Sequence, residues 1–203
     1  MTGPSSCAEN SIRFDNITIH PFKNTMWTYT IVKYPFNDIV NMGIFSDKDI
    51  VEGMMTGYLG ISDYSERGLT PNGYDLRIAE ISIRGDENKY TEGTVTIPPR
   101  TMFYVSTIER VRMPADACAQ LWLRTTWIRK GIMGAFGKID AGFEGTLTLG
   151  AYNATDDPVE LPIGERFCQM VFEGLNSCSV KDYAERSGNY QGQTGITLEP
   201  VKK

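Results

Sequence analysis

The chain has 203 residues, of which 41% are hydrophobic and 22% charged, and its formal net charge is −5. This length and composition predict one globular domain with a buried core. The negative charge gives no overall nucleic-acid footprint, although a local group of Arg and Lys could still bind a small polyanion. No apolar run approaches the ~20 residues of a membrane helix, and the first ten residues lack the features of a secretory signal. We therefore expect a cytoplasmic protein that binds neither nucleic acid nor a membrane.

The histidine and cysteine content excludes several kinds of catalysis. His20 is the only histidine, so a Ser-His-Asp triad would have to be built on it. The H-x-E and P-C-x-x-C motifs of zinc-dependent deaminases are absent. Cys7, Cys118, Cys168 and Cys178 show no C-x-x-C spacing, and no disulfide framework is expected. Catalysis must then rest on carboxylates, hydroxyls, arginines or a metal ion carried by the substrate.

The first 41 residues differ in pattern from the rest of the chain. Most of their apolar residues lie in the stretch 17–36, and we expect residues 1–41 to form an N-terminal extension of unknown role. Residues 17–32 could instead add a strand, because their apolar residues partly alternate. A new segment then begins at Met42. Ser46, with Asp49 three residues later, matches a capping box and predicts a short helix that ends near Met55.

After this helix the chain is a succession of short apolar stretches separated by Pro and Gly. The predicted strands are residues 74–83, 93–97, 101–113, 117–123, 145–152, 159–161 and 166–173. Regularly spaced short strands with turn signals predict a mainly β fold, an antiparallel barrel or a jelly-roll-like sandwich. Residues 176–203 are polar and contain several glycines, which predicts a mobile C-terminal arm rather than a core element.

Five sequence blocks carry a resemblance to a known family. They are residues 72–76 (NGYDL), 124–132 (RTTWIRKGI), 139–149 (IDAGFEGTLTL), 164–172 (GERFCQMVF) and 189–195 (NYQGQTG). In this order, on a β-rich background, they resemble the family that unites dCTP deaminases and dUTPases, over roughly residues 42–198. The resemblance implies a distorted antiparallel β-barrel with a short N-terminal helix. It also implies a homotrimer with active sites at the subunit interfaces and Mg²⁺ bound with the triphosphate.

The second block is interpreted as a phosphate-binding segment. A triphosphate needs several cations and donors in a fixed array, and guanidinium groups supply them. Arg124 and Arg129 lie five residues apart, with the hydroxyls of Thr125 and Thr126 between them. The alternative is a pair of surface arginines with threonines in a turn. The family has serines where this chain has threonines, so the added methyl groups would crowd the phosphate site.

The third block contains the predicted chemical centre. A carboxylate can orient and deprotonate a water molecule, and the resemblance implies that Asp140 does so, with Arg129 as a second catalytic residue. It also implies that Phe143 packs on the deoxyribose and leaves no room for a 2′-hydroxyl. Residues 140–142 could equally form an ordinary β-turn, in which Asp and Gly are common, and both interpretations can hold together.

The remaining blocks supply further candidate residues. Asp75 could support a metal-bound water, since Mg²⁺ prefers oxygen ligands and keeps several waters; a strand-end Asp bonded to its own backbone is the alternative. By resemblance, Arg166 and Gln169 belong to the wall of the site, although Gln169 could instead be a buried amide satisfied by backbone groups. Deaminases carry a triphosphate-binding Lys where this chain has Asn189, and Lys138 could partly replace its charge.

The C-terminal arm is expected to act as a lid. Tyr183, Tyr190 and Gln193 lie in a polar segment punctuated by glycines, which is typical of a lid that becomes ordered on binding a ligand. We therefore assign these three residues to the substrate-binding group.

One position separates the two reactions of the family. Deaminases have a Glu ten residues after the Asp of the third block, as the base that activates water for attack on cytosine. Here that position is Gly150, which cannot accept a proton. The eleven residues from Arg129 to Asp140 also resemble the shorter loop of archaeal dUTPases. The sequence therefore predicts a dUTP diphosphatase, which converts dUTP to dUMP and pyrophosphate.

Two alternatives remain open at this stage. One is a dCTP deaminase, including a bifunctional one, that recruits Glu144 or another carboxylate as its base. The other is a catalytically silent nucleotide-binding homologue.

Overall fold

The structure is a computed structural model, and it describes residues 43–134 and 136–200. All of these belong to one compact unit, Asn41–Lys203. The predicted extension over residues 1–41, with its alternative strand at 17–32, lies outside the described residues. No helix in the described ranges is long and apolar enough to cross a membrane.

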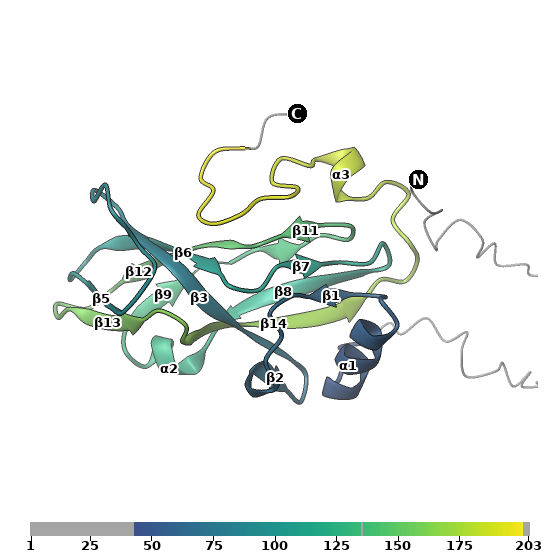
Figure 1. Ribbon diagram of the computed structural model, residues 1–203, viewed down its shortest axis with the longest axis horizontal. Coiled ribbons are helices and arrows are strands. Elements are labelled where there is room, and N and C mark those ends of the chain that lie inside the picture. Colours follow the sequence, from purple (N-terminus) through teal and green to yellow (C-terminus); the bar gives the residue numbers. More distant parts are fainter. Residues whose placement is uncertain (1–42, 135, 201–203) are drawn as a thin grey trace, which may run out of the picture. The chain divides into compact units, whose positions relative to one another are not determined.

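The described residues form many short strands and few helices (Figure 1). The helices are α1 (Asp47–Met55), the 3₁₀ turn η1 (Glu66–Gly68), α2 (Thr125–Ile128) and α3 (Tyr183–Arg186). The strands are β1 (Gly60–Ile61), β2 (Leu69–Thr70), β3 (Gly73–Ile83), β4 (Lys89–Tyr90), β5 (Thr94–Ile97), β6 (Met102–Thr107), β7 (Val111–Arg112), β8 (Ala117–Leu123), β9 (Ile132–Gly134), β10 (Lys138–Ile139), β11 (Glu144–Gly145), β12 (Thr148–Asn153), β13 (Val159–Pro162) and β14 (Arg166–Gly174).

Helix α1 begins where the capping box predicted. The Ser46 hydroxyl accepts a hydrogen bond from the Asp49 amide, and the Asp49 carboxylate accepts one from the Ser46 amide. These two bonds satisfy amides that have no partner within the helix. Ile50 and Gly53 are buried on the inner face of α1.

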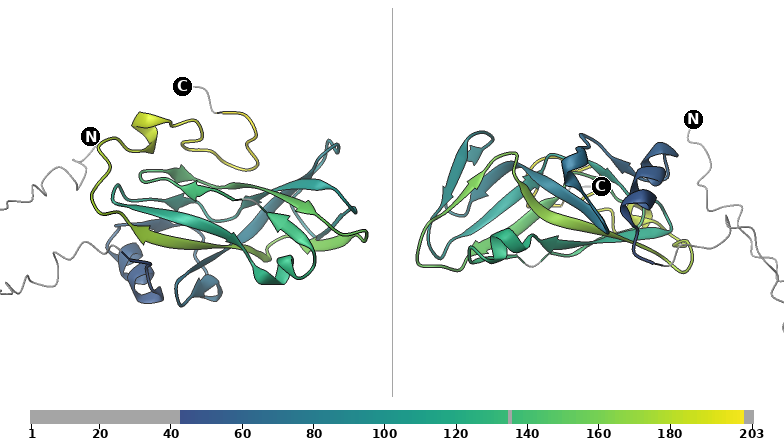
Figure 2. Two further views of the ribbon diagram at one scale, coloured as in Figure 1. Left: turned by 180° about the vertical axis from the view of Figure 1, so that it is seen from behind. Right: turned by 90° about the horizontal axis from the view of Figure 1, so that it is seen from below.

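A curled antiparallel sheet is the main architectural element. Its nine strands follow the order β10-β8-β14-β3-β6-β12-β9, with β2 and β4 paired to β3 off this path. Two smaller sheets, β1-β7-β11 and β13-β5, complete the β structure of the described residues. The views from behind and below show how the sheet curls (Figure 2). The mainly β, antiparallel fold predicted from the sequence is confirmed.

The prediction of one strand over residues 101–113 is wrong in one respect, because this stretch forms two strands, β6 and β7, that lie in different sheets. The chain leaves the nine-stranded sheet near Glu109, whose side chain is fully buried. Its carboxylate accepts a hydrogen bond from the Arg77 amide at 2.8 Å and pairs with the Arg77 guanidinium at 2.7 Å. The need to satisfy this buried charge bends the chain out of the sheet.

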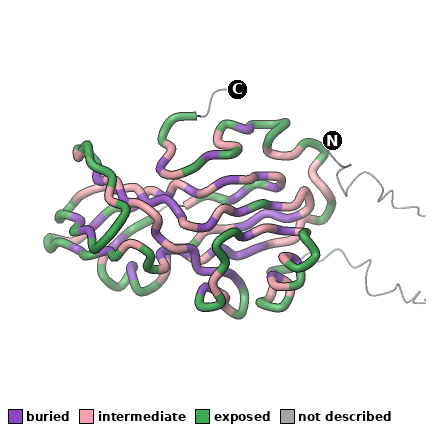
Figure 3. The backbone as a smooth tube through the Cα atoms, in the orientation of Figure 1, coloured by how far each residue is buried: buried purple, intermediate pink, exposed green. Residues whose placement is uncertain are grey.

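The core lies along the inner face of the curled sheet, where buried positions alternate with exposed ones (Figure 3). Tyr74, Phe103, Phe167 and Phe172 are its largest fully buried side chains. Cys118 and Cys168 are free and buried, as expected for small apolar residues.

Candidate active site

A cavity of about 410 Å³ lies between the curled sheet and the C-terminal arm. Six of the predicted site residues contribute to its lining, and they come from two of the five sequence blocks, the third and the fifth, or from the segments before them. These six residues are Lys138, Asp140, Phe143, Tyr183, Tyr190 and Gln193. The structure therefore brings together the candidate base, the candidate sugar-packing ring and the candidate lid residues.

Asp140 stands at the start of a tight turn that follows β10. The Phe143 amide donates to the Asp140 carbonyl oxygen at 3.1 Å, and Gly142 has a φ of 80°, a combination typical of a type II turn. The Asp140 side chain is exposed, and its carboxylate has no hydrogen bond or ion pair with any described residue. The turn interpretation and the site interpretation are thus compatible: the turn holds a free carboxylate at the cavity wall.

Phe143 forms an aromatic wall of the cavity with Tyr183. Phe143 is 5% exposed, and the two ring centroids lie 5.5 Å apart at an interplanar angle of 75°. The Tyr183 amide donates to the Ala141 carbonyl at 2.9 Å, which fixes the start of α3 against the turn. Gly142 allows this approach, because a Cβ there would lie 2.5 Å from the Cβ of Asp182.

The C-terminal arm is bonded along the segment that follows this turn, above β11 in Figure 1. The Gly192 amide donates to the Glu144 carbonyl at 2.7 Å, and the Thr146 amide donates to the Gln193 carbonyl at 3.0 Å. The Gln193 side chain, 8% exposed, donates to the Thr146 carbonyl at 2.7 Å. The arm was expected to be mobile and separate from the core, but its described part is packed on the sheet.

Gly150 lies on the cavity wall, on the strand that would carry a deaminase base. A Cβ built on Gly150 would be 3.6 Å from the Met102 methyl carbon and 3.7 Å from the Tyr104 ring, which is ordinary van der Waals contact. Packing therefore does not demand glycine at this position. Asp140 is the only carboxylate residue in the cavity lining formed by the described residues.

Glu144 does not line the cavity. Its carboxylate pairs with the Arg110 guanidinium at 3.1 Å, and β11 aligns it with Arg112 of β7 rather than with β12. A role for Glu144 as a recruited deaminase base has no geometric support in this arrangement.

Lys138 has a partner that sequence spacing did not indicate. Its ammonium lies 3.2 Å from the Glu173 carboxylate, and this hydrogen bond raises the pKa of Lys138. The pKa of the Glu173 carboxyl is lowered, mainly by a hydrogen bond from the Gln120 amide and to a smaller extent by the hydrogen bond and positive charge of Lys138. Lys138 is 56% exposed and remains within reach of a bound anion, but its charge is partly engaged.

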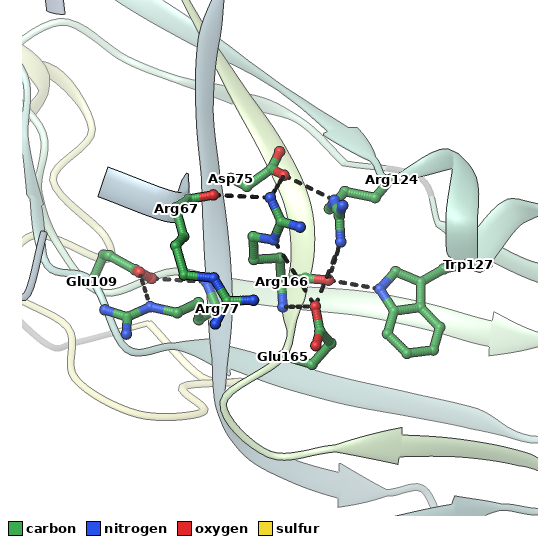
Figure 4. Close-up of polar contacts among 8 residues, drawn as sticks. All are labelled: Arg67, Asp75, Arg77, Glu109, Arg124, Trp127, Glu165 and Arg166. Atoms are coloured by element: carbon green, nitrogen blue, oxygen red, sulfur yellow. Dashed lines mark hydrogen bonds and ion pairs between the residues drawn. The ribbon is translucent and has the colours of Figure 1, made fainter. Parts of the chain in front are cut away.

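A second group, here called the arginine cluster, consists of Asp75, Arg124, Glu165 and Arg166 (Figure 4). The Asp75 Oδ2 lies 2.9 Å from Arg124 Nε and 3.4 Å from Arg166 Nη1. Glu165 Oε1 lies 3.7 Å from Arg124 Nη1. Burial raises the pKa of the Asp75 carboxyl, and the charges of the two arginines oppose this without cancelling it. None of the four lines the cavity.

Helix α2 presents the rest of the predicted phosphate-binding segment. Thr125 and Thr126 form its first turn and are exposed, and Arg129 caps its other end, also exposed. Trp127 is buried, and its indole nitrogen donates to the Arg166 carbonyl at 2.8 Å. The helix is therefore fixed to the start of β14, with its polar side chains directed outward.

Gln169 lies beside the arginine cluster, in register with Asp75 across β14 and β3. Its amide nitrogen donates to the Thr70 hydroxyl at 2.8 Å, so its partner here is a side chain and not the backbone. Thr70 and Glu165 were not identified from the sequence. Glu165 lies within the fourth block, but only the fold shows that it faces Arg124.

The predicted site residues thus form two sets within one chain. The cavity set contains Asp140 and Phe143, while the arginine cluster and α2 hold the predicted phosphate-binding groups. Asp75 was considered as support for a metal-bound water, and here its carboxylate contacts two guanidinium groups. In the described residues there is no cluster of three or more His, Cys, Asp or Glu side chains that could hold a metal ion.

Comparisons with known proteins agree with this architecture. The model of a family described as dCTP deaminase-like matches residues 44–175. A dCTP deaminase of Pyrococcus horikoshii is 44% identical over 147 residues, which cover 70% of this chain and 91% of that protein. A probable deoxyuridine 5′-triphosphate nucleotidohydrolase of Sulfolobus islandicus rod-shaped virus 1 is 35% identical over 157 residues, covering 76% of this chain and 97% of that protein.

A solved structure shows the same fold. The 2′-deoxycytidine 5′-triphosphate deaminase of Agrobacterium tumefaciens aligns with a TM-score of 0.59 at 20% identity, over 66% of this chain and 49% of that chain. The family match and the identity of the curated relatives together establish that the chain belongs to the dCTP deaminase-like family, as its five sequence blocks predicted.

Proposed function

We propose that this protein is a dUTP diphosphatase, which hydrolyses dUTP to dUMP and pyrophosphate. One observation carries the proposal: Asp140 is the sole carboxylate residue in the cavity lining of the described residues, while Gly150 occupies the position of the deaminase base. A free, exposed carboxylate can orient a water molecule and accept its proton. Removal of ammonia from cytosine needs a further proton carrier near the base, and the cavity wall formed by β12 offers none.

The chemistry follows from the placement of the cavity residues. The deoxyribose packs on Phe143, and the arm with Gln193 covers the base. Asp140 takes a proton from water as the water oxygen attacks the α-phosphorus. The bond from this phosphorus to the bridging oxygen breaks, and pyrophosphate leaves with the electron pair. The substrate is dUTP with bound Mg²⁺, which neutralises part of the triphosphate charge.

The phosphate-binding groups would reach this cavity from a second copy of the chain. Within one chain, Arg124, Thr125, Thr126 and Arg129 do not line it. Exposed apolar side chains surround α2, with Trp122 58%, Ile128 53% and Met133 63% exposed. Such a surface fits a subunit interface. A homotrimer, in which α2 of one subunit faces the cavity of the next, would complete three equivalent sites.

The substrate test separates the proposal from its alternatives. The protein is incubated with dUTP or with dCTP in the presence of Mg²⁺, and pyrophosphate and ammonia are followed in parallel. We expect pyrophosphate from dUTP and no ammonia from dCTP. Ammonia from dCTP would overturn the assignment in favour of the deaminase, the activity for which the Pyrococcus relative is named. No product from either nucleotide would indicate a silent homologue.

A subunit-mixing experiment tests the shared site. Asp140→Asn and Arg129→Ala are each expected to abolish most activity. In the proposed site, one subunit supplies Asp140 and its neighbour supplies Arg129. After the two variants are mixed and allowed to exchange subunits, some sites contain neither substitution, and activity should partly return. Each variant treated in the same way alone is the control. If mixing restores nothing while exchange is demonstrated by labelled subunits, the composite site is wrong.

A further inference from the structure

The Asp75 carboxylate is the meeting point of two guanidinium groups. Its side chain is only 6% exposed, and a single oxygen, Oδ2, contacts both Arg124 and Arg166. The Arg166 guanidinium is also held from the other side, since its Nη1 donates to the Arg67 carbonyl at 2.9 Å. Figure 4 shows both guanidinium groups directed at the same oxygen of this carboxylate. A buried carboxylate paired in this way is committed to its cations.

The contacts of Arg124 fix the direction of its guanidinium group. Its Nε faces Asp75, and its Nη1 donates to the Arg166 carbonyl at 3.2 Å and lies near Glu165. Its Nη2 makes no hydrogen bond with any described residue. A free arginine side chain samples many rotamers, and ordering it costs conformational entropy. Here two of the three nitrogens are held before any ligand arrives, and one is left available.

The same carbonyl anchors the helix that follows Arg124. Trp127 and Arg124 both donate to the Arg166 carbonyl oxygen, at 2.8 Å and 3.2 Å. The guanidinium group and the first turn of α2, with Thr125 and Thr126, are therefore fixed to one point on β14. A residue that fixes the position of Arg166 therefore also fixes the position of Arg124 and of the first turn of α2.

We propose that Asp75 is a positioning residue for phosphate binding. It aligns Arg124, and with it the α2 surface, toward the phosphate chain of the nucleotide, and it acts through the arginines and not through a metal-bound water. The proposal deepens the proposed function, since it concerns the same site, but it requires only that the ligand carries a chain of phosphates.

Charge and position predict opposite effects when Asp75 is replaced by Asn. The substitution removes a negative charge close to a polyanion site, so Coulomb attraction alone predicts tighter binding of an anion. Loss of positioning predicts weaker binding, because Arg124 must then be ordered by the ligand itself. A role through bound Mg²⁺ predicts weaker binding only when the metal ion is present.

Binding of inorganic tripolyphosphate to the full-length protein distinguishes these three cases. We expect Asp75→Asn to weaken it on the order of tenfold, and equally in EDTA and in Mg²⁺. Asp116→Asn is the matched control, because Asp116 is also a partly buried carboxylate, bonded to the Tyr58 hydroxyl at 2.7 Å away from the cluster. It should leave the affinity unchanged. Binding of dUMP should change little in either variant.

A double-mutant cycle shows whether the effect passes through Arg124. In an Arg124→Met background, Asp75→Asn should have little further effect on tripolyphosphate binding. Glu165→Gln, at a side chain 46% exposed, provides a variant that should fold normally; we expect a smaller loss of affinity, about twofold to threefold, that also disappears in the Arg124→Met background.

Several outcomes would overturn the proposal. One is that Asp75→Asn binds tripolyphosphate as tightly as the unchanged protein or more tightly, and another is that its affinity falls only when Mg²⁺ is present. The proposal is also wrong if Asp75→Asn lowers the affinity equally in the Arg124→Met background, or if it lowers the affinity for dUMP as much as that for tripolyphosphate. If neither tripolyphosphate nor α,β-imido-dUTP binds the unchanged protein, the phosphate role of Arg124 is wrong. Because tripolyphosphate has no base, a protein that binds it as expected but fails to hydrolyse dUTP would contradict only the proposed function.

Discussion

Asp140 and Asp75 are both aspartates of the family blocks, yet their surroundings differ in almost every respect. Asp140 is exposed at a cavity wall, and its carboxylate has no partner in the described part of the chain. The Asp75 side chain is 6% exposed and contacts two arginines. A carboxylate that takes a proton from water must keep lone pairs and solvent within reach, whereas one that holds cations gives them up. The same side chain thus suits catalysis in one place and alignment in the other.

The largest effect is expected at Asp140. Asp140→Asn keeps the size and hydrogen-bonding shape of the side chain but removes its basicity, so kcat for dUTP should fall by roughly 10²–10⁴. Nucleotide affinity should hold or rise, because a carboxylate near a triphosphate repels it. Steady-state pyrophosphate release and equilibrium binding of α,β-imido-dUTP measure the two effects. Near-normal turnover would remove Asp140 from the mechanism and erase the contrast with Asp75.

The C-terminal arm should contribute the next largest effect. Truncation after Lys181 removes Tyr183, Tyr190 and Gln193 from the cavity wall, and we expect activity to fall by roughly a hundredfold, since the nucleotide is no longer held in place. The core remains, so thermal unfolding should change far less. Full activity in the truncated protein would show that the arm does not help to form the site.

Phe143 tests the specificity of the cavity set. Phe143→Ala removes the aromatic wall that is expected to crowd a 2′-hydroxyl, so the preference for dUTP over UTP should fall on the order of tenfold. The ratio of kcat/KM for the two nucleotides is the measurement. Tyr183→Phe retains the ring packed against Phe143 and serves as the control. An unchanged ratio would place the sugar elsewhere.

The smallest effect is expected at Glu144. Glu144→Gln breaks an ion pair with Arg110 in which both side chains are roughly two-fifths exposed, and such pairs contribute about 0–1 kcal/mol. Hydrolysis of dUTP should be unchanged, and urea denaturation should show a small loss of stability at most. A large loss of activity would mean that a second carboxylate takes part in the chemistry.

Local patterns predicted the parts of the fold that depend on neighbours in sequence. The capping box at Ser46, the turn at Gly142 and the alternation of short strands are all local features, and the structure reproduces them. The division between β6 and β7 was missed because it depends on buried Glu109, whose partner Arg77 lies 32 residues away. A short sequence pattern around Glu109 does not include Arg77, so it cannot reveal their contact.

Several of the residues predicted for the site line one cavity, but the grouping of the others could not be predicted from the sequence. Motif spacing identified Asp140, Phe143 and Gln193, which do meet at one cavity. It did not show that Arg124 and Arg166 share the carboxylate of Asp75, because this contact depends on how β3, β8 and β14 lie side by side. The contacts of Asp75 with two guanidinium groups could therefore not be predicted from its motif alone.

The bonding of the arm to residues 142–146 has a consequence for aggregation. β11 is paired with β7 on one side only, and the arm supplies backbone partners for the Glu144 carbonyl and the Thr146 amide. An uncovered strand edge is a template on which another chain can add a strand. The arm that lines the cavity therefore also covers a strand edge, and its removal would leave that edge open to another chain.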